Sequence, residues 1–189
     1  MTSRAQDHLI PAILIGYIVL LMPPVQHALT ASMALQTLVQ IPLLAAIGWL
    51  AAVSFPPRIA ISVAPWNRGG FSGLILAVST AAFWMLPRSL DAATTDPLMI
   101  AAKFVSIPLL IGVAMGLSWP RMGFVLRGFV LLELVATLFR LGWLYTATPI
   151  RLCNAYLLGD QQRSGQYMLW VGVILLLGFG TKLIWGSTR

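Results

Sequence analysis

Three side chains in this sequence carry the soft donor atoms that bind Cu(I). His27 and Met33 lie six residues apart at the start of one hydrophobic run, and Cys153 is the single cysteine of the chain. Imidazole, thioether and thiolate groups together suit Cu(I) better than Mg²⁺ or Ca²⁺. This pattern makes copper a candidate cofactor and His27, Met33 and Cys153 its candidate ligands. The alternative is structural, because methionine is ordinary core filler and His27 suits a membrane interface.

Glu133 is the deepest ionisable residue within the hydrophobic runs. It precedes Thr137 by four residues and Arg140 by seven, which places the three on one helical face. Because an isolated charge inside a membrane is costly, this face should point into a bundle of helices. Two interpretations stay open: Glu133 binds a proton or a cation, or it pairs with Arg140 and holds helices together.

Further charged residues gather near the ends of the hydrophobic runs. Arg88 and Asp91 follow the third run, and Lys103 lies about two turns inside the fourth. A lysine at that depth is expected to extend its ammonium group towards the membrane surface or to pair with a nearby acid. These residues are predicted to organise a polar cluster that contacts a partner or supports the fold.

The segment 151–166 is the longest polar stretch, and it follows Pro149. It contains Asn154, Asp160 and Gln161, which are added to the predicted polar cluster. Leucine and tyrosine alternate with charged residues here, a pattern that favours a short amphipathic helix at the membrane interface. Exposed loops of this kind are common places of partner contact.

The elements that must position these residues are transmembrane helices. Of the 189 residues 59% are hydrophobic and 9% are charged, far from the balance of a soluble domain. A spanning helix needs about 20 mostly apolar residues. Six stretches fit or nearly fit this length: 9–24, 29–53, 71–86, 98–119, 124–145 and 167–185. The prediction is an all-α integral membrane protein, a bundle of about six transmembrane helices forming one domain over residues 1–189.

The distribution of basic residues predicts the orientation of this bundle. Loops rich in arginine and lysine resist translocation and stay in the cytoplasm. One side of the predicted bundle carries seven basic residues, whereas on the other side Arg88, Arg151 and Arg163 are balanced by Asp91, Asp96 and Asp160. The basic side has Arg4, Arg58, Arg68, Arg121, Arg127, Lys182 and Arg189. Both termini are therefore predicted to be cytoplasmic.

Several functions are disfavoured by what the sequence contains. Neither of the two histidines lies in the middle of a predicted helix, so no haem is expected. The net charge of +7 is scattered between apolar runs and forms no basic stripe, so nucleic acid is not an expected partner. We expect no enzymatic activity either, since the sequence has no hydrolase motif, nucleophile–base pair or phosphate-binding glycine loop.

Three segments resemble the CtaG (caa3-type) family of cytochrome c oxidase assembly factors. The first is His27-x5-Met33 followed by Ile41-Pro-Leu-Leu-Ala-Ala-Ile-Gly48, and the second is Trp84-Met-Leu-Pro-Arg-Ser-Leu-Asp91. The third is Asp160-Gln-Gln-x-x-Gly165 running into Met168-Leu-Trp170. The resemblance implies a multi-pass protein of the bacterial inner membrane that takes part in copper delivery to, or maturation of, a haem-copper oxidase. The family has more helices and more histidines in the helix that matches the second one here.

Three functional hypotheses follow. The leading one is a membrane protein that assists assembly or copper loading of a haem-copper oxidase or another respiratory complex. The second is a permanent accessory or scaffold subunit of a redox or photosynthetic membrane complex. The third is a small transporter that uses Glu133. In each case the lipid bilayer and other membrane protein subunits are the expected partners.

Overall fold

The computed structural model describes residues 3–185, with the side chains of residues 9–182, and every regular element in that range is helical. The all-α prediction is therefore confirmed for the described chain. Contacts within the chain group it into two compact units, unit 1 (Met1–Gly123) and unit 2 (Phe124–Arg189). Each unit is considered by itself below.

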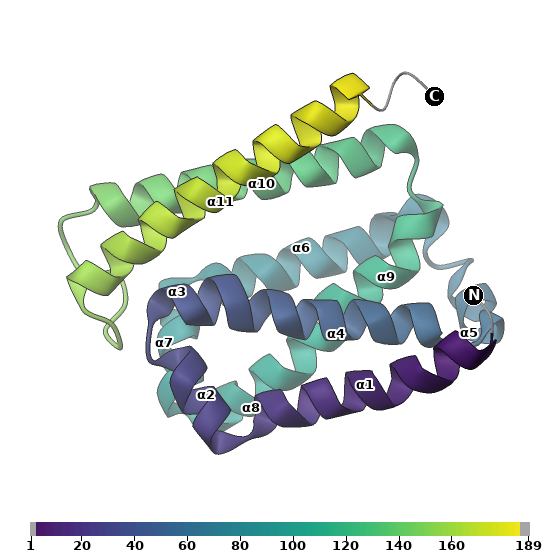
Figure 1. Cartoon of the computed structure of the whole chain (residues 1–189), viewed down its shortest axis with the longest axis horizontal. Coiled ribbons are helices and arrows are strands. Elements are labelled where there is room, and N and C mark those ends of the chain that lie inside the picture. The colour runs from purple at the N-terminus through teal and green to yellow at the C-terminus, as the bar shows by residue number, and fades with distance from the viewer. Residues whose placement is uncertain (1–2, 186–189) are drawn as a thin grey trace. The chain divides into compact units, whose positions relative to one another are not determined.

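Unit 1 is built from a succession of long and short helical segments (Figure 1). In chain order they are α1 (Ser3–Leu21), α2 (Pro23–Thr30), α3 (Met33–Leu35), η1 (Gln36–Gln40), α4 (Ile41–Ser54), α5 (Pro57–Val63), η2 (Arg68–Gly70), α6 (Phe71–Met85), α7 (Pro87–Thr95), α8 (Pro97–Ser106), η3 (Ile107–Val113), α9 (Ala114–Ser118) and η4 (Trp119–Arg121).

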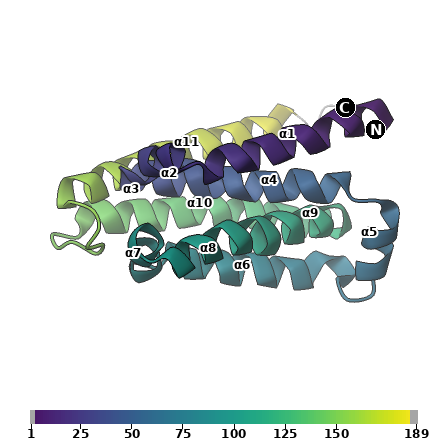
Figure 2. The same ribbon diagram turned by 90° about the horizontal axis from the view of Figure 1, so that it is seen from below.

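Two of the long helices in unit 1 contain a wider, π-helical stretch. The helix Met33–Ser54 includes η1, and the helix Pro97–Arg121 includes η3. The second of these helices packs against both α4 and α6, and α1 covers α4 from outside (Figure 2). Insertions of this kind are frequent at functional sites because they turn side chains away from the regular helical register.

Prolines begin several of the short helices. Pro23, Pro57, Pro87 and Pro97 each occupy the first turn, where the missing N–H costs no hydrogen bond. Consequently α2 and α7 are helical rather than irregular, and they meet the preceding helices α1 and α6 at bends of 69° and 73°. The predicted spans 9–24 and 71–86 end beside Pro23 and Pro87, and neither short helix was predicted.

Glycines let the two π-containing helices of unit 1 cross at backbone contact. A Cβ atom added to Gly48 would lie 1.9 Å from the carbonyl oxygen of Pro108. One added to Gly112 would lie 2.3 Å from the carbonyl oxygen of Ala45. Gly48 and Gly112 therefore leave the space in which one backbone rests on the other. The crossing thereby sets the spacing between helix Met33–Ser54 and helix Pro97–Arg121.

Unit 2 is a hairpin of two long helices, α10 (Phe124–Ala147) and α11 (Leu158–Trp185). They pack along their length and are joined by the loop 148–157. Near this loop a Cβ atom on Gly142 would come within 2.9 Å of the carbonyl oxygen of Gly165, so the helices cross closely here too.

Several helices could cross a membrane, which supports a multi-pass membrane protein. Met33–Ser54, Pro97–Arg121 and Leu158–Lys182 are long and apolar enough individually, and two bent pairs, α1 with α2 and α6 with α7, raise the number to five. The predicted span 124–145 corresponds to α10, which is not among these five and carries Arg127, Glu133 and Arg140. Six spans and cytoplasmic termini stay predictions; the chain ends lie outside the described residues.

Candidate functional site

Lys103 is the centre of a buried polar cluster in unit 1. Its side chain is only 1% exposed, and the ammonium nitrogen donates to the Oε1 atom of Gln40 at 2.9 Å and to the backbone carbonyl of Ala93 at 3.4 Å. Both acceptors are neutral. The expectation that Lys103 extends to the surface or pairs with an acid is therefore wrong: its side chain turns inward, towards an amide on another helix.

The π-helical stretch η1 supplies the amide side of this cluster. Gln36, Thr37 and Gln40 are all buried, and the Thr37 hydroxyl donates to the backbone carbonyl of Met33 at 2.8 Å. The Nε2 atom of Gln40 is buried and has no hydrogen-bond partner among the described residues. Sequence reasoning did not select Gln40. The signal was available, because two glutamines four residues apart interrupt an apolar run.

Two aromatic side chains hold the helix that carries Lys103. The indole nitrogen of Trp84 donates to the hydroxyl of Ser106 at 2.8 Å, and the Tyr17 hydroxyl donates to the backbone carbonyl of Phe104 at 2.9 Å. Buried tryptophan and tyrosine usually find such partners for their polar atoms. Together they tie α8 to α6 and α1, so Lys103 lies on an element fixed from two sides.

The other predicted site residues of unit 1 differ in burial. His27, in α2, and Arg88, in α7, are exposed, and Asp91 is half-buried. Met33 is fully buried. Among the side chains described, those of residues 9–182, no group of three or more histidine, cysteine or acidic residues is arranged to hold a metal ion.

Unit 2 contains the buried thiol of Cys153, which is 1% exposed. Gln161, also buried, holds the loop on which Cys153 lies. Its Oε1 atom accepts from the backbone N–H of Leu152 at 2.8 Å, and its Nε2 atom donates to the carbonyl of Ile150 at 3.4 Å. A side chain on α11 thus fixes the backbone directly before the cysteine.

The loop region differs from its predicted form. The interfacial helix expected within 151–166 is not a separate element, because α11 begins at Leu158 and continues without a break. Asp160 lies in the first turn of α11, where a carboxylate is favoured by the helix dipole. Asn154 stays in the irregular loop and is exposed. The acidic residue in the first turn explains why this polar segment joins the long helix.

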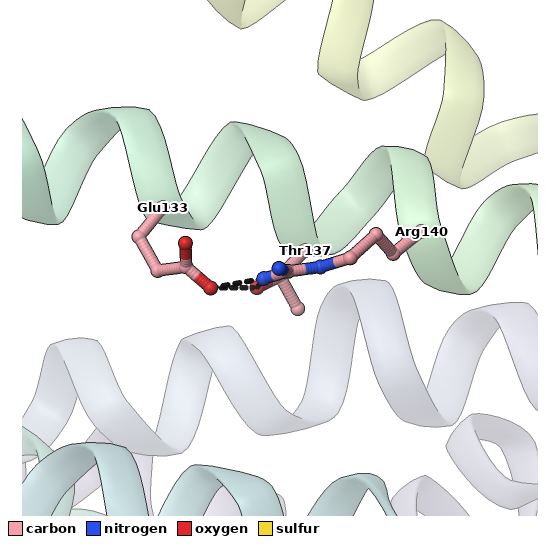
Figure 3. Close-up of polar contacts among 3 residues, drawn as sticks. All are labelled: Glu133, Thr137 and Arg140. Carbon is pink, nitrogen blue, oxygen red and sulfur yellow. Dashed lines mark hydrogen bonds and ion pairs between the residues drawn. The ribbon is translucent and has the colours of Figure 1, made fainter.

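Glu133 and Arg140 form an ion pair along one face of α10 (Figure 3). The Thr137 hydroxyl lies between them, donating to Glu133 at 3.3 Å and accepting from Arg140 at 3.1 Å. The side chains of Arg140 and Glu133 are 64% and 43% exposed. Glu133 therefore has the predicted pairing with Arg140, but both residues lie on α10, so the pair joins no two helices.

The pairing leads to a stability prediction. Glu133→Gln and Arg140→Gln should each lower the free energy of unfolding by about 0.2–1 kcal/mol, the range of exposed ion pairs, because each leaves the partner charge without its charged hydrogen bond. The double variant should recover part of that loss, and a double-mutant cycle would measure the coupling. A proton-site role would show the opposite pattern: Glu133→Gln would abolish ion-dependent uptake in proteoliposomes while leaving stability unchanged.

Comparison with known protein families, curated proteins and solved structures finds no match to this chain. The resemblance to the CtaG family rests on the three motifs alone. Their residues Met33, Trp84 and Gln161 are all buried, two of them in unit 1 and one in unit 2.

Proposed function

We propose that this chain is a non-enzymatic protein of the bacterial cytoplasmic membrane that assists assembly or copper loading of a haem-copper oxidase or another respiratory complex. The observation that carries the proposal is the position of the resembling motifs. Trp84 anchors the helix of Lys103, Gln161 anchors the loop of Cys153, and Met33 begins the helix that bears Gln40. These motif residues therefore support the two buried polar sites, around Lys103 and around Cys153, in addition to packing between helices.

Copper would be handled through Cys153 on this proposal. The thiol is shielded and its loop is held by Gln161, and a thiolate is the donor that Cu(I) favours. A single buried thiol in unit 2 fits a transient transfer completed by a partner's ligands better than a resident copper centre.

The test is copper delivery in cells that lack this protein. Complementation with the wild type should restore copper in the partner oxidase, whereas Cys153→Ser should restore several-fold less, because the soft donor is gone. Gly159→Ala is the matched control, since nothing lies within 4 Å of the added methyl group and it is six residues away in the same segment. Equal restoration by wild type and Cys153→Ser would remove copper from the proposal.

A permanent accessory subunit is the second candidate. Large apolar side chains are exposed on both helices of unit 2, among them Phe129, Trp143 and Trp170. Such a surface suits either lipid or a neighbouring subunit, since both are apolar. Purification from the native membrane separates the two candidates: a stoichiometric, lasting complex favours the accessory subunit, and a transient or substoichiometric association favours the assembly factor.

A further inference from the structure

The buried ammonium group of Lys103 has no charged partner among the described residues. Its two acceptors are an amide oxygen and a backbone carbonyl, and the ion pair found in the described chain belongs to α10 in the other unit. Ionisable residues inside a membrane usually pair with one another or with backbone carbonyls. Lys103 has one long contact of the second kind, at 3.4 Å, and none of the first. A full positive charge in this enclosure therefore calls for a counter-charge.

The same cluster has more hydrogen-bond donors than acceptors. A lysine ammonium has three N–H donors, and two of them are used. The Nε2 atom of Gln40 offers two more and has no partner. Nε2 is bonded to the same carbon as the Oε1 atom that accepts from Lys103. The unused donors of Gln40 therefore belong to the amide group that contacts the ammonium group. Buried donors without partners are rare in folded proteins, and their common explanation is a bound water or ion.

The surroundings limit the size and charge of whatever completes the cluster. Lys103 and Gln40 are almost completely buried, and Trp84 and Tyr17 tie the helix of Lys103 in place from two sides. The helices that carry Gln40 and Lys103 are in backbone contact where they cross at Gly48 and Gly112. A group that accepts hydrogen bonds, balances one positive charge and fits this enclosure is a small monovalent anion.

We propose that Lys103 and Gln40 form a binding site for a small monovalent anion of halide size, chloride being the abundant one. The anion accepts the unused N–H of Lys103 and those of the Gln40 amide. It neutralises the buried charge and satisfies the donors that the protein leaves open. The site belongs to unit 1 and does not depend on the proposed role in oxidase assembly.

The experiment uses the full chain in detergent micelles. It is purified throughout in sodium gluconate, because the gluconate anion is too large for the site. Chloride added at equal ionic strength should raise the thermal midpoint of the wild type in a saturable way, by roughly 5 °C at saturating concentration. Lys103→Met removes the charge at nearly equal length and should lose the response. Arg68→Met, an exposed basic residue of the same unit, should keep it.

Gln40→Glu is the decisive variant, because it also covers the case in which Lys103→Met fails to fold. Its carboxylate supplies the counter-charge from the protein itself, so the variant should be stable in gluconate and indifferent to chloride. Crystals of the wild type grown with bromide should show an anomalous peak beside the Lys103 ammonium group. Equal midpoints of the wild type in chloride and gluconate, or a chloride response that survives in Gln40→Glu, would overturn the proposal.

Discussion

Gly48→Ala should lower the free energy of unfolding by about 3 kcal/mol or more, at the upper end of what overpacking costs. The added methyl group would lie 1.9 Å from the carbonyl oxygen of Pro108, and the obstacle is backbone, which cannot rotate aside as a side chain can. Either helix Met33–Ser54 or helix Pro97–Arg121 has to move. Unfolding by denaturant in micelles, followed by circular dichroism, measures the loss.

Gly16→Ala is the matched control for this change. It adds the same methyl group to a helix of the same unit, yet the nearest atom, Cδ1 of Ile47, is 3.9 Å away. Alanine favours a helix over glycine by roughly 0.5–1 kcal/mol, so Gly16→Ala should be neutral or slightly stabilising. If both variants lost stability equally, the helix crossing at Gly48 would not have the close approach described here.

Hydrophobic length alone predicted most of the helical framework. The stretches 29–53, 98–119 and 167–185 fall within or largely overlap helices that are long and apolar enough to span a membrane. This works because a membrane span requires a continuous apolar run, which is visible in any window of the right length. The division into two units after Gly123 was not predicted, since it depends on which helices contact one another and hydropathy carries no such information.

The short helices α2 and α7 were missed for a local reason. The predicted spans 9–24 and 71–86 stop near Pro23 and Pro87, although proline in a first helical turn can begin a new helix where the previous one ends. The same proline is therefore compatible with a loop after the first helix and with a second helix. Deciding between them required knowing that the chain turns by 69° and 73° at these points and then continues as a helix.

The candidate site was predicted in part. Lys103 was predicted as an intramembrane charge, but its side chain was predicted to extend towards the surface, whereas it turns inward to Gln40. Gln40 was not predicted as a site residue. The depth of a lysine in a span can be counted from the sequence, whereas the helix it faces cannot. An acid near Lys103 in the sequence looked like the natural partner, yet the tertiary packing brings the Gln40 amide to within 2.9 Å instead.

Gln161→Leu should release the loop that carries Cys153 and make its thiol reactive. The substitution introduces an apolar side chain of similar size and removes the acceptor of the Leu152 N–H and the donor to the Ile150 carbonyl. Losing two such bonds costs about 2 kcal/mol in net terms. If local opening of the loop exposes the thiol, this cost raises the rate of labelling by a thiol reagent about 30-fold, since each 1.4 kcal/mol is a factor of ten.

Gln162→Leu distinguishes a specific release of the loop from a general effect of losing a polar group near the start of α11. Gln162 is the neighbouring residue and is half-buried, but the loop hydrogen bonds belong to Gln161. Its replacement should leave the labelling rate close to that of the wild type. Equal acceleration in both variants would mean that Cys153 is shielded by the packing of α11 as a whole. A thiol shielded in that way could meet a copper-bearing partner only after the hairpin of unit 2 opens, whereas a thiol held by Gln161 needs only the loop to move.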